Sequence, residues 1–171
     1  MQPVSKSPIR FAMLALATLL IATPVAAQKV DTKGEKELTA HGRSVDKVSA
    51  AADPSRVNDH LVDQWKGTQF KFDAASQPRE LTAQDVENLR RQKLGYGEIS
   101  ILLALIAGQP DPPTGKSLNG ILGLRQVGAG WGKIARHLGY PSLAAVNKSV
   151  MATEAGVEKV SATGKAEKVG R

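Results

Sequence analysis

The chain has 171 residues, no cysteine, and 23 Lys and Arg against 16 Asp and Glu, a formal net charge of +7. Without cysteine the protein has no disulfides, no thiol chemistry and no bacterial lipoprotein anchor. The moderate charge permits weak attraction to nucleic acid, anionic lipid or acidic polymers, but it requires none of them because acids alternate with bases along most of the chain.

Residues 1–27 have the pattern of a secretory signal peptide. Lys6 and Arg10 supply its basic start, residues 11–21 its apolar core, and small residues lead to Ala27, after which we expect cleavage. The apolar run is shorter than the ~20 residues of a membrane-spanning helix, which disfavours the alternative of an uncleaved anchor. Cleavage leaves 144 residues, with 21 bases against 16 acids and a net charge of +5. We therefore expect a periplasmic or secreted protein with no transmembrane segment after cleavage.

Residues 28–54 are polar, with few large apolar side chains. Such a composition buries little apolar surface, so it predicts a flexible arm. The helical domain is expected to begin at Ser55, a potential cap for a helix over residues 56–66. One face of that helix would be apolar, carrying Val57, Leu61, Val62 and Trp65.

Residues 66–80 have the composition of a loop, with Phe70 and Phe72 as the expected core contributors. Their alternation with polar residues also suits a short strand, but the sequence offers that strand no evident partner. The next helix is expected to begin with a capping box formed by Thr82 and Asp85.

One phrase then occurs twice at a constant offset of 35 residues: Leu-Arg, followed by Gly-aromatic-Gly and Ile. The two copies are Leu89-Arg90, Gly95-Tyr96-Gly97 and Ile99, and Leu124-Arg125, Gly130-Trp131-Gly132 and Ile134. We interpret each copy as a helix end, a turn through glycine covered by the aromatic ring, and the start of a second helix. We expect Gly95 and Gly130 to occupy equivalent turns, with Gly95 left-handed, and we expect Trp131 to be buried. The alternative, that Tyr96, Trp131 and Tyr140 stack on a nucleic acid or sugar polymer, is less favoured than packing between helices.

The second helix of the first copy, residues 98–107, is apolar on nearly all sides, which predicts the buried central element of the fold. Residues 108–116 contain three prolines and must form a loop. Thr114-Gly115-Lys116-Ser117 resembles the end of a phosphate-binding loop, but Pro110 stands where that motif needs glycine. Ser117 is better explained as a helix cap.

The second copy predicts helices over 118–126 and 131–138, followed by a last helix from 143 to about 153. Residues 154–171 lack a convincing apolar face, which predicts a disordered tail.

The phrases at 94–99 and 130–135 resemble those of small exported bacterial proteins of unknown function, in which the Gly-aromatic-Gly phrase also follows a Leu-Arg helix. The resemblance covers about residues 82–139. It implies an exported location and no particular activity.

Residues 134–148 also resemble the helix-turn-helix of bacterial DNA-binding domains, through Ile134, Ala135, Leu138 and Gly139. That resemblance implies that a recognition helix directs three side chains toward bases or phosphates, namely Ser142, Asn147 and Lys148. Export would separate such a protein from the chromosome, so nucleic acid is disfavoured as a partner.

No constellation of catalytic residues stands out. His41, His60 and His137 are scattered, and no serine lies in a nucleophile-elbow pattern. Asp59 and Asp63 share a helix face that could hold a cation weakly, but a solvated face is the favoured interpretation. We expect no catalytic residue, no metal and no cofactor.

These observations predict a small all-α domain, over residues 55–153, of tandem helix-turn-helix units around a buried apolar helix, with a flexible arm and tail. The favoured function is an exported, non-enzymatic structural or interaction protein of the bacterial cell envelope or exterior, with an unknown protein or envelope polymer as its partner. The alternative is helix-turn-helix-like binding of nucleic acid or another anionic polymer through a basic surface; a hydrolase of envelope polymers ranks third. The candidate surface lies beside the second copy and comprises Arg125, Lys133, Arg136, His137 and Lys148.

Overall fold

Helices dominate the computed structural model, which describes residues 32–109 and 115–169, with side chains as far as residue 164. The predicted signal peptide, residues 1–27, lies outside the described residues. The prediction of a small all-α domain is confirmed, since the described residues form seven helices and one two-stranded sheet. In chain order the elements are α1 (Thr32–Ser49), α2 (Pro54–Gln64), β1 (Gln69–Phe70), β2 (Arg79–Glu80), α3 (Ala83–Arg91), α4 (Tyr96–Ala107), α5 (Leu118–Gln126), α6 (Trp131–His137) and α7 (Ala144–Val169).

Helix α4 is the central element, as its composition predicted. Ten of its 12 residues are buried, and it contacts α1, α3, α5, α7 and β1. A helix that is apolar all round needs neighbours on every side, and these five elements provide them. None of the helices in the described part of the chain is both long and apolar enough to cross a membrane.

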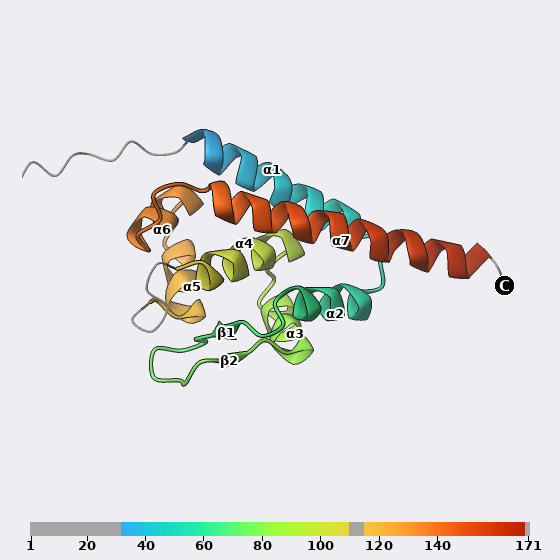
Figure 1. Cartoon of the computed structure of the whole chain (residues 1–171), viewed down its shortest axis with the longest axis horizontal. Helices are drawn as coiled ribbons and strands as arrows, with labels where there is room; N and C mark the ends of the chain where they lie inside the picture. The colour runs from blue at the N-terminus through green and yellow to red at the C-terminus, as the bar shows by residue number, and fades with distance from the viewer. Residues whose placement is uncertain (1–31, 110–114, 170–171) are drawn as a thin grey trace, which may run out of the picture.

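The prediction of a flexible arm is wrong for residues 32–54. Most of this segment is helix α1, which lies beside α7 along one side of the molecule (Figure 1). Its buried residues recur every three or four positions, which places them on one stripe facing α4 and α7: Gly34, Leu38, Gly42, Val45 and Ser49. Three of these five residues are Gly or Ser, so a search for large apolar side chains overlooks the stripe.

The predicted disordered tail is also wrong as far as residue 169, because α7 continues to Val169. Val157 and Ser161 are buried beyond the expected end of the helix. Small residues again explain the error: Gly156 lies so close to α2 that a Cβ atom there would stand 2.0 Å from the His60 ring. The helical domain therefore extends beyond the predicted limits 55–153 at both ends.

The two copies of the repeated phrase adopt the same backbone path. Gly95 and Gly130 are the N-caps of α4 and α6, with φ angles of −69° and −68°, so the predicted equivalence is confirmed. The left-handed position is not Gly95, however. It falls two residues earlier, at Lys93 (φ 67°) and Gly128 (φ 83°), which are again 35 residues apart and end the preceding helices.

The aromatic residue of each copy is buried, as predicted for Trp131. Tyr96 and Trp131 are 6% and 5% exposed. An arginine from the preceding helix covers each ring, with its guanidinium carbon 4.5 Å from the Tyr96 centroid for Arg90 and 4.2 Å from the Trp131 centroid for Arg125. Each arginine also donates to a carbonyl of the turn that it spans. The Leu-Arg and Gly-aromatic parts of the phrase thus form one packing unit.

The predicted helix caps and the short strand are confirmed only in part. Thr82 and Asp85 form the predicted capping box, and Ser117 caps α5 through Gly120 N. Ser55 is not the cap of α2, because Asp53 takes that position and the helix starts at Pro54. The short strand has a partner, since β1 pairs with β2 in an antiparallel hairpin.

Candidate functional site

Arg125, the first residue of the predicted binding surface, is used inside the fold. Besides covering Trp131, it donates from Nη1 to the Ala129 carbonyl at 2.8 Å and from Nη2 to Glu98 Oε1 at 3.1 Å. This ion pair links α5 to α4, across the two copies. A ligand would have to compete with all three partners for Arg125, so we remove this residue from the candidate surface.

The other four predicted residues lie on α6 and α7. Lys133 and His137 are exposed on α6, and Arg136, which is half-buried, donates from Nε to the Gly132 carbonyl at 3.4 Å. Lys148 is exposed on α7. Residues 138–143 connect α6 to α7. Together with Arg125 on α5, the five predicted residues are therefore spread over three helices.

The helix proposed to recognise DNA is the start of α7, and its packing argues against that role. Val146 and Val150 are buried, and Asn147 donates from Nδ2 to the Gly34 carbonyl of α1 at 3.2 Å. The expectation that Asn147 points toward bases is therefore wrong. Ser142 and Lys148 remain exposed.

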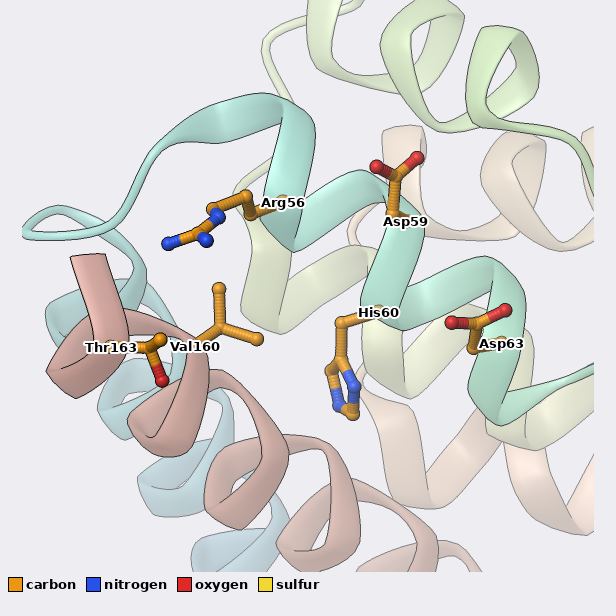
Figure 2. A pocket seen from close by; sticks show the side chains of 6 residues that line it. All are labelled: Arg56, Asp59, His60, Asp63, Val160 and Thr163. Atoms are coloured by element: carbon orange, nitrogen blue, oxygen red, sulfur yellow. The ribbon is translucent and has the colours of Figure 1, made fainter. Parts of the chain in front are cut away.

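A cavity of about 280 Å³ lies between α2 and α7 (Figure 2). Its lining comes from both helices: Arg56, Asp59, His60, Asp63, Val160 and Thr163. The imidazole of His60 turns toward α7, whereas Asp59 points away from it (Figure 2). Within the described ranges, 32–109 and 115–169, no group of three or more His, Cys, Asp or Glu is placed to hold a metal ion.

His60 is held neutral by its position. Burial lowers the pKa of His60 below its usual 6.5, against Asp63, which raises it, and with Lys159, which lowers it further. Its Nε2 atom is buried without a hydrogen-bond partner, and the ring fills the space left by Gly156. The arrangement packs an uncharged ring between two helices and joins α7 to α2.

Helices α1 and α7 are joined by a polar cluster on Glu154. One carboxylate oxygen accepts from Ser44 Oγ at 2.5 Å, and the other lies 2.9 Å from His41 Nδ1. Burial raises the pKa of Glu154, but the hydrogen bonds from Ser44 and His41 outweigh it, so the net pKa is lowered. Glu154, which lies in the predicted tail, therefore has a structural role.

The exposed side of α1 is the feature that sequence analysis missed. Its outward positions carry four cations, which follow a spacing of three or four residues with Ala40 between them: Lys33, Lys36, Arg43 and Lys47. The buried residues of α1 follow the same spacing of three or four residues, and this pattern could have indicated both the buried and the exposed side of the helix.

Comparison with known proteins gives no match: no protein-family model, no curated protein and no solved structure matches this chain.

Proposed function

We propose that this chain is an exported, non-enzymatic interaction protein of the cell envelope or exterior. Export is supported by the pattern of residues 1–27, with Lys6 and Arg10 before an apolar core and small residues before Ala27. The proposed partner is a protein or polymer of the envelope.

The observation that carries the interaction role is the division of charged groups within α1. Its cations lie on the exposed side, whereas Asp46 and Glu35 lie against the two glycine turns, within 2.5 Å of where a Cβ atom on Gly95 or Gly130 would stand. Charged side chains elsewhere are similarly used to join helices, as Arg125 and Glu154 are. This arrangement favours a protein whose internal charged residues hold the helices together, while the exposed cations of α1 remain available to a partner. A nucleic-acid role through the second copy is less favoured, because Arg125 and Asn147 are engaged within the fold.

The location is tested by fractionating the producing cells and determining the N-terminus of the protein by mass spectrometry. We expect a chain beginning at Gln28 in the periplasm or the medium. A matched variant carrying Val25→Arg and Ala27→Arg should keep residues 1–27, because cleavage needs small uncharged residues at these positions. Native protein found in the cytoplasm with Met1 to Ala27 intact would refute export and with it this function.

A further inference from the structure

The outward side of α1 is unusually one-sided in charge. Four cations are exposed along the helix, against one exposed carboxylate, Glu37, which lies 3.9 Å from Lys33. The other two acids of the helix are Glu35 and Asp46, and both are turned toward the glycine turns. The helix therefore directs two of its three carboxylates inward and all four of its Lys and Arg side chains outward.

Helix α7 extends this surface because it runs parallel to α1. Asn147 bonds Gly34 near the start of both helices, and Glu154 bonds Ser44 further along both, as their side-by-side course in Figure 1 shows. The outward positions of α7 include Lys148, Met151, which is 51% exposed, and several exposed alanines. Two turns after Met151 follow the exposed Glu158 and Lys159, whose opposite charges add no net charge to this side. We call the resulting surface the basic face and define it by Lys33, Lys36, Arg43, Lys47, Lys148 and Met151.

We infer that the basic face docks on an anionic lipid surface. The inference rests on the proposed function, because export brings the chain to a membrane surface. A helix of 18 residues is about 27 Å long, so the cations of α1 are spread along a line that can meet several headgroups at once. Each Lys or Arg near an anionic membrane attracts it by about 1 kcal/mol.

The shape and the apolar part of the face favour a lipid surface over a strand of polyanion. Two parallel helices present a broad side rather than a groove that follows one chain. Met151 and the alanines around it offer apolar contact at the level of the headgroups, while the long stems of the lysines can lie along the same boundary.

The test measures binding of the exported form, beginning at Gln28, to vesicles of phosphatidylcholine alone and of phosphatidylcholine mixed with phosphatidylglycerol. We expect binding to the anionic vesicles only, weakening as salt is added. The triple variant Lys36→Gln, Arg43→Gln and Lys47→Gln should bind on the order of a hundredfold more weakly, because three cations are lost. These side chains are exposed and Gln has a helix propensity close to that of Lys, so the variant should fold, as circular dichroism would verify.

A second triple variant serves as the matched control: Lys66→Gln, Lys116→Gln and Lys133→Gln remove the same charge from exposed positions outside the basic face. It should bind like the native protein, apart from a small loss from the lower net charge. An equal loss of vesicle binding in both triple variants would overturn the inference, since the net charge of the protein, and not the basic face, would then account for the binding. Tighter binding to a single-stranded oligonucleotide than to anionic vesicles would also overturn it, by assigning the face to a polyanion.

The two proposals fail in distinguishable ways. An exported protein that ignores anionic vesicles contradicts the lipid inference alone. A cytoplasmic protein with residues 1–27 retained contradicts the proposed function, whatever the vesicles show.

Discussion

Asp46 of α1 accepts a hydrogen bond from the backbone N–H of Gly97, with 2.9 Å between Oδ1 and N. Gly97 lies in the first turn of α4, where backbone N–H groups have no partner within the helix and a negative charge is favoured by the helix dipole. Eleven residues earlier, and so three turns along the same side of α1, Glu35 lies against Gly130 at the start of α6. One helix thus meets both copies of the repeated phrase with a carboxylate.

Replacing Asp46 with Ala should lower the free energy of unfolding by about 1 kcal/mol, the usual cost of losing a side-chain cap. Asp46→Asn should retain most of the stability, because its amide oxygen can still accept from Gly97. Glu37→Ala is the control, since it removes an exposed acid from the same helix and should change stability by less than about 0.5 kcal/mol. Chemical denaturation measures all three, and an Asp46→Ala variant as stable as the control would contradict the capping role.

Gly97→Ala should be far more damaging than an alanine at another helical glycine. A Cβ atom on Gly97 would stand 1.9 Å from the Gly42 carbonyl oxygen, so α1 and α4 would have to separate, at a cost of about 3 kcal/mol or more. Gly123, at an exposed position of α5, has nothing within 4 Å of such an atom, so Gly123→Ala should stabilise by up to about 1 kcal/mol. Thermal unfolding separates the two, and the contact between α1 and α4 would be disproved if both substitutions were harmless.

The stability of the native protein should fall on acidification below about pH 6.5 partly because of His60. Its pKa is lowered in the folded state by burial, so the unfolded chain takes up the proton more readily and gains stability relative to the fold as the pH falls from the unfolded pKa through the folded one. His60→Leu removes this group, so the loss of stability between pH 7.5 and 5.5 should be smaller in the variant. Identical pH dependence in the two proteins would show that His60 is not buried as described.

The fit between His60 and Gly156 can be tested separately at pH 7.5. In a His60→Ala background, Gly156→Ala should stabilise by up to about 1 kcal/mol through helix propensity. In the native background the same substitution should lose that gain, because the new methyl group and the His60 ring cannot occupy the same space. The double-mutant cycle gives the difference, and an equal effect in both backgrounds would mean that the two residues are not in contact.

The part of the fold that the sequence predicted well is the repeat. A nearly continuous apolar run defines α4, and large apolar residues at helical spacing define α5. Thr82 and Ser117 mark the starts of α3 and α5, so local chemistry was sufficient for this part of the fold. Helix α1 and the part of α7 beyond residue 153 were missed because small residues such as Gly42 and Ser161 hold their buried positions. Such positions are recognised as core only when the partner helix is known.

The candidate site illustrates the same limit. Arg125 looked available for a ligand because its partners are distant or non-obvious in sequence, with Glu98 27 residues away. The exposed cations of α1 looked like an ordinary polar segment because the buried stripe on the other side of the helix holds mostly Gly and Ser. Spacing can indicate a face, but packing decides which face remains exposed.

Both the described fold and the basic face require that α1 is packed as a helix against the rest of the molecule. Amide hydrogen exchange on the chain beginning at Gln28 tests this packing most directly. We predict that amides of residues 38–49 exchange nearly as slowly as those of residues 102–106 in α4, because both segments open only when the core opens. Exchange of residues 38–49 at the rate of an unfolded chain, with α4 still protected, would contradict the structure of α1 and remove the basis for the face that it presents.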